Sequence, residues 1–176
     1  MKLEQQPTLL KILLADDDTD DRYFFEEALK GFLQPTELIV VQDGEQLLQL
    51  LTNETNELPH VLFLDLNMPR KNGFECLSQI KASKRLKDLP VIIYSTSFHR
   101  KIAELLYENG ANYYISKPSE MAQLKKAIQQ TLTAIAQKNI LQPAKKYFIV
   151  TAEKKNYSTF LWFNNFFTMP FAYNFN

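Results

Sequence analysis

The stretch Val61-Leu-Phe-Leu-Asp65-Leu-Asn67-Met68-Pro69 decides the fold. It is a short apolar run that ends in one carboxylate and is followed by a turn containing proline. A continuous apolar run of this length is typical of a strand buried on both faces, as in a parallel sheet covered by helices on each side. In such folds ligands bind beyond the carboxyl ends of the strands, which puts Asp65 where a reactive group is expected. Taken alone, an Asp at the end of a strand more often only caps the turn.

Segments with the patterns of strands and helices alternate along the chain. Further strands are predicted at 9–15, 37–41, 91–94 and 112–116. Helices are predicted at 19–32, 47–51, 73–83, 102–106 and 121–135. In the third of these helices, Phe74, Leu77 and Ile80 are expected to face the core. The alternation predicts an α/β fold, a doubly wound five-stranded parallel sheet with five flanking helices.

Composition excludes several classes of protein. The 176 residues include 20 Lys plus Arg and 20 Asp plus Glu, so the formal net charge is zero. This balance gives no electrostatic basis for binding nucleic acid or an anionic membrane. Cys76 is the only cysteine, which excludes an internal disulfide framework and a multi-cysteine metal site.

The ends of the chain suggest where the protein works and how it is divided. Residues 1–10 lack the pattern of a secretory signal, and no apolar segment is long enough to span a bilayer. We therefore expect a cytoplasmic protein. Its predicted parts are an N-terminal extension over 1–8, one domain over 9–142, and a C-terminal extension over 143–176.

Polar residues stand at the ends of four predicted strands. Asp16 and Asp17 follow the first strand, Asp65 the third, Ser95 the fourth and Lys117 the fifth. Because parallel strands end at one edge of the sheet, these side chains are expected to converge. Clustered carboxylates repel one another unless a cation joins them, and an all-oxygen site suits Mg²⁺. A hydroxyl and an ammonium opposite suit a phosphoryl group, so the set predicts a site that forms an aspartyl phosphate.

The sequence resembles a known family, the receiver domain of two-component response regulators, over about residues 9–140. The motifs that carry the resemblance are Ile-Leu-Leu-Ala-Asp16-Asp17, Leu-Asp65-Leu-Asn67-Met68-Pro69 with Asn72-Gly73, Ser95-Thr96, and Lys117-Pro118. Each motif is modest by itself, but the four in this order and spacing are highly specific. The resemblance implies a flavodoxin-like receiver fold.

The resemblance also implies the roles of the acidic residues. Asp65 would accept the phosphoryl group from the phosphohistidine of a sensor histidine kinase. Asp17 and Asp65 would bind Mg²⁺ through their side chains, Asp16 would act largely through water, and Asn67 would bind through its backbone carbonyl.

The remaining matched residues would form the switch. By resemblance, Ser95 would hydrogen-bond the phosphoryl oxygens and Lys117 would pair with them. Tyr114 matches the aromatic residue that moves inward together with the hydroxyl residue. A two-state loop after the fourth strand would convert the added charge into a changed surface.

Some neighbouring residues depart from the family pattern or invite a plainer interpretation. Thr96 stands where the family usually has Ala or Gly, and its bulk is a candidate obstacle to water or small phosphodonors. Asp18 is expected to be the N-terminal cap of the first helix. The pair Arg70-Lys71 is expected to be solvated in its turn.

The run from Leu66 to Gly73 also looks like that of stand-alone receivers that work with sensor kinases, such as the phytochrome-associated ones.

The C-terminal extension does not fit the receiver pattern. Residues 147–150 are predicted to be extended and to lie back on the domain. Nine of the last twenty residues are aromatic, and the segment is too short and too interrupted by polar residues and Pro170 for a membrane span. Three interpretations stay open: a dimerisation or partner-docking arm, an element packed on its own domain, or a tail without a selected role.

These observations predict a single-domain response regulator that is not an enzyme and that signals through changed protein contacts. Passing phosphate to a histidine phosphotransfer protein, or storing it, is an equal alternative. A phosphorylation-independent adaptor is a further alternative. A phosphatase of the haloacid-dehalogenase type is disfavoured, because that family needs an Asp two residues after the nucleophile and Asn67 stands there.

Overall fold

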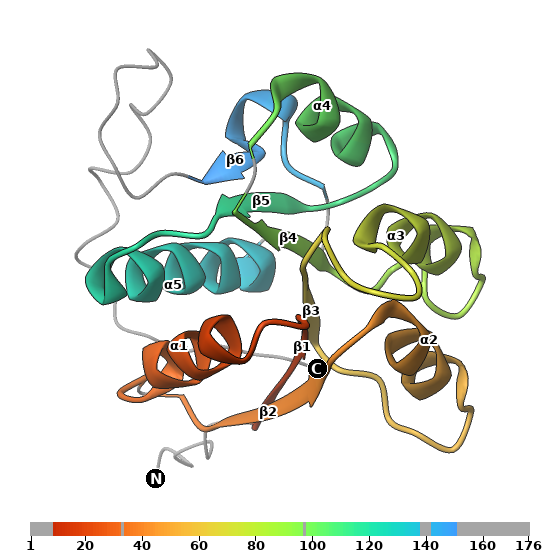
Figure 1. Cartoon of the computed structure of the whole chain (residues 1–176), viewed down its shortest axis with the longest axis horizontal. Coiled ribbons are helices and arrows are strands. Elements are labelled where there is room, and N and C mark those ends of the chain that lie inside the picture. Colours follow the sequence, from red (N-terminus) through yellow and green to blue (C-terminus); the bar gives the residue numbers. More distant parts are fainter. Residues whose placement is uncertain (1–8, 33, 97, 138–141, 151–176) are drawn as a thin grey trace, which may run out of the picture.

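The computed structural model describes residues 9–32, 34–96, 98–137 and 142–150. Its centre is one sheet with the strand order β2-β1-β3-β4-β5-β6 in which every neighbouring pair is parallel (Figure 1). The strands are β1 (Leu10–Ala15), β2 (Thr36–Val41), β3 (Val61–Leu64), β4 (Val91–Ser95), β5 (Tyr113–Ser116) and β6 (Ile149–Val150). The helices are α1 (Thr19–Leu29), α2 (Gly44–Thr52), α3 (Gly73–Ala82), α4 (Arg100–Glu108) and α5 (Met121–Gln137). The α/β prediction and the five helices are confirmed, but the sheet has six strands, not five.

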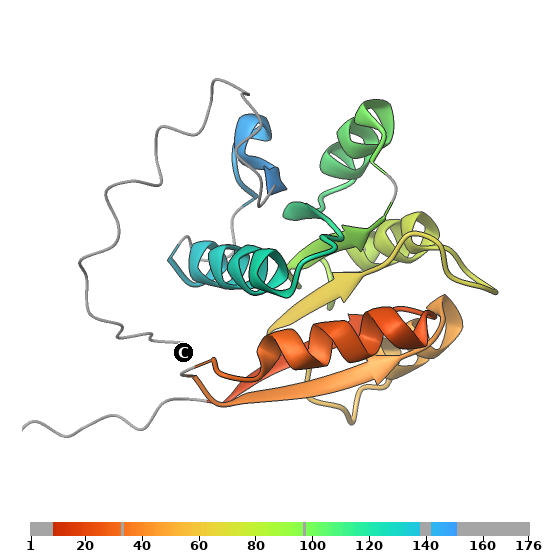
Figure 2. The same cartoon turned by 60° about the vertical axis from the view of Figure 1, so that its left-hand side comes forward.

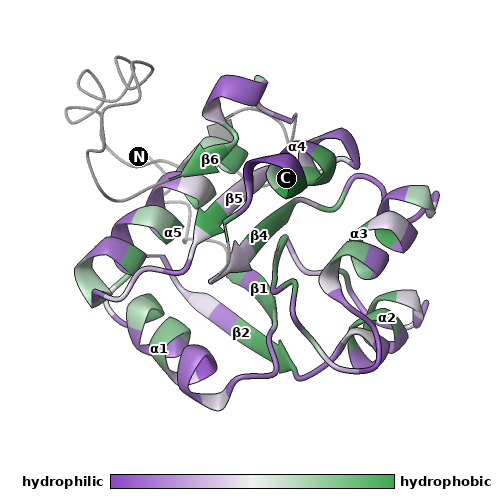
Figure 3. Cartoon of the chain, turned by 45° about the horizontal axis from the view of Figure 1, so that its top comes forward, coloured by the Kyte–Doolittle hydropathy of each residue, from purple (hydrophilic) through white to green (hydrophobic). Residues whose placement is uncertain are grey.

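The helices cover both faces of the sheet and create two apolar cores. Helices α1 and α5 lie side by side on one face (Figure 2), and α2, α3 and α4 lie on the other. Successive residues of β1 pack alternately into the two cores. Ile12 and Leu14 face α1 and α5, and Leu13 and Ala15 face the other helices. Because both faces are buried, the central strands are apolar at nearly every position, as the hydropathy colouring shows (Figure 3).

Side-chain caps decide where three of the helices begin. Asp18 accepts hydrogen bonds from the first turn of α1, as predicted, and Asp43 does the same for α2. Asn72 and Glu75 form a reciprocal capping box at the start of α3. Asp18 and Asp43 follow β1 and β2 within three residues, so these two loops are short, whereas a longer loop separates β3 from Asn72.

The predicted burial of Phe74 is wrong, and its neighbour explains why. A Cβ atom on Gly73 would lie only 2.1 Å from the carbonyl oxygen of Asp65, so α3 rests on the β3 loop at this residue. That contact turns Gly73, Leu77 and Ile80 toward the core. Phe74 is one residue further, about 100° around the helix axis, and is 37% exposed.

Residues 142–150, the C-terminal segment, close the β5 edge of the sheet. Gln142 donates to the carbonyl oxygens of Tyr107 and Ala111, at 2.6 and 2.7 Å, and the Tyr107 hydroxyl donates to the Pro143 carbonyl at 3.0 Å. After a 3₁₀ turn (Lys145–Tyr147), β6 pairs with β5. The expectation that residues 147–150 lie back on the domain is confirmed, but only Ile149 and Val150 are extended. Tyr147 belongs to the 3₁₀ turn and Phe148 has helical backbone angles, so the predicted strand is wrong at these two positions.

Phe148 anchors this segment. Its side chain is 2% exposed and meets the rings of Tyr107 and Tyr114 edge-on, with centroid distances of 5.3 and 6.3 Å. The predicted domain boundaries stay predictions, and the aromatic run after Tyr157 lies outside the described residues. Across the described ranges, no helix combines the length and apolar surface that a bilayer span requires.

We expect Phe148→Ala to lower the free energy of unfolding by about 3 kcal/mol, because it removes a buried ring that fills the space between two tyrosines. Urea unfolding followed by circular dichroism measures the change. Lys146→Ala, an exposed position in the same segment, is the control and should lie within about 0.5 kcal/mol of the parent protein. Equal stability of the two variants would show that the ring does not anchor the segment.

Candidate functional site

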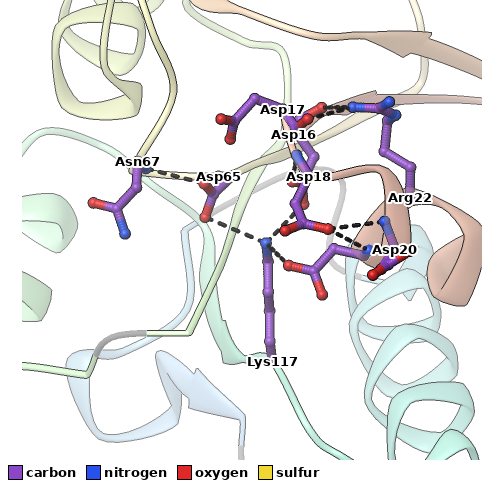
Figure 4. A network of polar contacts seen from close by, with 9 residues as sticks. Asp16, Asp17, Asp18, Asp20, Arg22, Asp65, Asn67 and Lys117 are labelled. Atoms are coloured by element: carbon purple, nitrogen blue, oxygen red, sulfur yellow. Dashed lines mark hydrogen bonds and ion pairs between the residues drawn. The ribbon is translucent and has the colours of Figure 1, made fainter.

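Four neighbouring strands bring the predicted residues to one edge of the sheet. In the order β1-β3-β4-β5, these strands end at or just before Asp16 and Asp17, Asp65, Ser95, and Lys117. Figure 4 shows Asp16, Asp65 and Lys117 pointing toward one another across this edge. The predicted convergence is therefore present in the structure.

The acidic residues form a compact oxygen cluster. One carboxylate oxygen from each of Asp16, Asp17 and Asp65 lies within 4.8 Å of the others. Asp16 and Asp65 are buried, whereas Asp17 is exposed at the rim. Three carboxylates in this spacing fit a hard divalent cation such as Mg²⁺ or Mn²⁺, which prefers oxygen ligands.

Asp65 is held in a defined orientation. The backbone N–H of Asn67 donates to Asp65 Oδ2 at 3.0 Å, while Oδ1 faces the ammonium group of Lys117. The turn that follows is fixed by a hydrogen bond from the Gly73 N–H to the Leu66 carbonyl. The carboxylate thus has one oxygen tied to the loop and the other directed into the site.

Lys117 is the cation that balances this cluster. Its side chain is 6% exposed, and Nζ lies 2.8 Å from Asp16 Oδ2, 2.7 Å from Asp21 Oδ2 and 3.6 Å from Asp65 Oδ1. Nζ also lies 5.1 Å from the centre of the Tyr94 ring. Burial by itself would lower the pKa of Lys117, but the bonds to Asp16 and Asp21 raise it above its usual value.

Burial and the neighbouring groups shift the pKa of Asp16 in opposite directions. Burial raises the pKa of Asp16 to about 6, although Lys117 and the Asp18 backbone N–H favour the ionised form. A buried carboxylate that ionises this reluctantly gains from a further positive charge beside it. Asp16 Oδ2 is also buried without a hydrogen-bond partner, and this unpartnered oxygen makes the cluster a fitting cation site.

The predicted switch residues lie beside the acidic cluster. The Ser95 side chain is fully buried at the end of β4, and Tyr114 on β5 is 1% exposed. Burial raises the pKa of Tyr114 to about 12, with the Ser95 hydroxyl acting in the opposite direction. The Tyr114 ring is covered by Phe98, at a centroid distance of 5.6 Å, and by Phe148. Thr96, the departure from the family pattern, is exposed.

Two interactions at this edge were not predicted. Asp21, in the first turn of α1, shares the Lys117 ammonium, and no motif in the sequence marks it. Arg70 adopts a left-handed backbone conformation with φ of 64° and forms an ion pair with the buried Asp43. Arg70 is exposed, as expected, but its guanidinium also ties the loop after Asp65 to the start of α2.

Comparisons with known proteins point to one family. Residues 12–129 match the model of the response regulator receiver domain. The chain is 34% identical to Response regulator Rcp1 of Synechocystis over 122 residues, which cover 67% of this chain and 83% of that protein. It is 30% identical to a chemotaxis protein CheY homolog of Campylobacter jejuni, over 70% of this chain and 92% of that one.

Solved structures agree with this result. The Mn²⁺-bound form of response regulator Rcp1 superimposes with a TM-score of 0.65 at 31% identity, covering 77% of this chain and 99% of that chain. The phosphorylated cyanobacterial phytochrome response regulator RcpA gives a TM-score of 0.66 at 30% identity, with coverage of 78% and 100%.

Replacing Arg70 by Ala should destabilise the protein at neutral pH, because Asp43 would keep a buried negative charge without its cation. The pKa of Asp43 is held below its usual value chiefly by Arg70, so the stability that the pair provides is present above the ordinary Asp pKa and is lost at lower pH. The difference in urea midpoint between Arg70→Ala and the parent is therefore expected to shrink below a pH of about 4.

The adjacent Lys71→Ala is the matched control and should show neither effect. If the loss of stability in Arg70→Ala did not change with pH, it would not come from the ion pair with Asp43.

Proposed function

Because the chain belongs to the response regulator receiver domain family, we propose that it is a single-domain response regulator whose phosphoacceptor is Asp65. The donor is the phosphohistidine of a sensor histidine kinase in the cytoplasm. The observation that carries this proposal is the position of Asp65, buried between two further carboxylates and the Lys117 ammonium.

The residues suit a phosphoryl transfer. A carboxylate oxygen of Asp65 attacks the phosphorus atom, the new O–P bond forms as the N–P bond of the phosphohistidine breaks, and the kinase imidazole leaves. Asn67 orients the carboxylate through its backbone N–H, and Lys117 offers positive charge to the phosphoryl oxygens.

Mg²⁺ is the proposed metal. The side chains of Asp17 and Asp65, the backbone carbonyl of Asn67 and, through water, Asp16 would hold it. When bound, the ion neutralises negative charge on the carboxylates and the phosphoryl oxygens. This role fits the raised pKa of Asp16, which favours an additional cation at the cluster.

The output is a change in protein contacts. A phosphoryl group adds negative charge and strong acceptor oxygens next to Ser95 and Lys117. Tyr114, beside Ser95, then carries the change to its neighbours Phe98 and Phe148. Candidate partners are the kinase, a histidine phosphotransfer protein that takes the phosphate onward, or a second copy of the chain. Nucleic acid is not among them, because the formal net charge is zero.

The proposal excludes an enzyme of the aspartyl-phosphate phosphatase type. Such chemistry needs a general acid two residues after the nucleophile, and the side chain at that position is the amide of Asn67. At most, slow self-dephosphorylation is expected. A phosphorylation-independent adaptor would retain the fold but has no need of the charge arrangement around Asp65.

Asp65→Asn should abolish incorporation of labelled phosphate from a small phosphodonor such as phosphoramidate while leaving the fold intact, because the amide has nearly the same shape but is a poor nucleophile. Asp88→Asn, at an exposed position outside the site, is the control and should incorporate phosphate at the parent level. EDTA should suppress incorporation in the parent protein. Normal labelling of Asp65→Asn would refute the assignment.

Lys117→Ala should uncouple phosphorylation from its structural effect, since the group that links the phosphoryl oxygens to β5 is removed. Hydrogen exchange at the amide of Tyr114, which donates to the Phe148 carbonyl at 2.8 Å, measures the effect. We expect phosphorylation to change this exchange rate in the parent and not in Lys117→Ala. The same change in both proteins would count against Lys117 as part of the switch.

A further inference from the structure

Asp21 occupies a position that the proposed chemistry does not yet use. It lies in the first turn of α1, with its side chain 31% exposed, and contacts a lysine 96 positions away in the sequence. The distance from Asp21 Oδ2 to Lys117 Nζ, 2.7 Å, is the shortest of the three carboxylate distances to this ammonium. The contact therefore joins α1 to the loop after β5 at the edge of the acidic cluster.

We propose that Asp21 is a positioning residue for phosphorylation: by its hydrogen bond, and together with the ion pair to Asp16, it holds the Lys117 ammonium so that a free N–H can reach the phosphoryl group on Asp65. This inference rests on the function proposed above and assigns it a residue outside the family motifs.

The count of hydrogen-bond donors supports this role. A lysine ammonium has three N–H groups. One of them donates to Asp21 Oδ2 at 2.7 Å, whereas Asp16 Oδ2, at 2.8 Å, pairs with the charge without accepting a hydrogen bond. Asp65 Oδ1, at 3.6 Å, is too far for a hydrogen bond. The hydrogen bond to Asp21 therefore fixes the ammonium while leaving it N–H groups that can donate to an oxygen of a phosphoryl group attached to Asp65.

The Lys117 ammonium needs a second ion-pair partner because the lysine side chain is flexible. Its ammonium is a point charge on a flexible four-carbon chain, and a single ion pair does not fix its direction. If only Asp16 held it, Lys117 could move onto Asp65 and mask the nucleophile. Asp21 opposes this movement from the other side, and it is itself fixed because its backbone N–H donates to the capping residue Asp18.

Asp20 provides a matched control. It stands next to Asp21 in the same helical turn, has the same charge and donates its backbone N–H to the same cap, but it makes no ion pair with Lys117 among the described contacts. Both residues interact favourably with the helix dipole. Loss of either negative charge favours an anion nearby, so a purely electrostatic role predicts tighter anion binding in both variants.

The first measurement is the affinity for beryllium fluoride, a phosphoryl mimic, at saturating Mg²⁺ in the parent, Asp21→Asn, Asp20→Asn and Asp21→Glu. We expect Asp21→Asn to bind about five-fold more weakly, as for the loss of one partly exposed charge-assisted bond. Asp20→Asn should bind equally or slightly more tightly, and Asp21→Glu should recover most of the affinity.

The second measurement needs neither metal nor phosphoryl mimic. In EDTA, the rate at which an amine-reactive reagent labels Lys117 is followed by peptide mass spectrometry, with the exposed Lys126 as internal reference. Asp21→Asn should label Lys117 several-fold faster than the parent does, and Asp20→Asn should not. A purely structural effect on α1 would not select Lys117 in this way.

The outcomes separate this inference from the proposed function. If the parent shows no binding of beryllium fluoride that depends on Asp65, the proposed function fails and the positioning role falls with it. If the parent binds the mimic but Asp21→Asn behaves as Asp20→Asn does in both measurements, the positioning role alone is overturned. Weaker binding with faster labelling in Asp21→Asn, recovered in Asp21→Glu, supports it.

Discussion

The structure of the acidic edge depends on the buried Lys117 ammonium. Carboxylates of Asp16, Asp21 and Asp65 surround it, and without a positive charge at their centre they would repel one another in a site from which water is largely excluded. The single ammonium offsets only part of this charge, so the edge retains an excess of negative charge. That excess attracts a divalent cation and also makes an incoming phosphoryl group dependent on positively charged neighbours.

Sheet topology makes this charge arrangement possible. Four adjacent parallel strands each contribute a side chain at the same edge, whereas an antiparallel neighbour would have its end at the opposite edge. The strands are fixed in this order by apolar cores on both faces, so the polar groups do not have to stabilise the fold that holds them. Tight contacts such as that of Gly73 against the Asp65 carbonyl then set the loops.

The residues at the strand ends could be located from the sequence because an apolar run marks each strand and the parallel order follows from the alternating pattern. Asp65 and Lys117 are of this kind. Asp21 could not be located, since its role depends on which side of α1 faces the loop after β5. The ion pair of Arg70 could not be predicted either. Its direction toward Asp43 depends on a left-handed backbone conformation, and no glycine or asparagine at this position signals that conformation. The strand β6 is only two residues long and has no periodicity of its own.

The C-terminal segment changes what the switch residue touches. Tyr114 is not at a free sheet edge, since its N–H donates to the Phe148 carbonyl and its ring meets that of Phe148. On the other side, the ring meets the 45% exposed Phe98 at the start of the α4 region. A movement of Tyr114 must therefore displace one of these two aromatic neighbours. Because Phe148 is 2% exposed and tied by backbone pairing, whereas Phe98 is half exposed, the Phe98 side offers less resistance, and the structural change should appear there first.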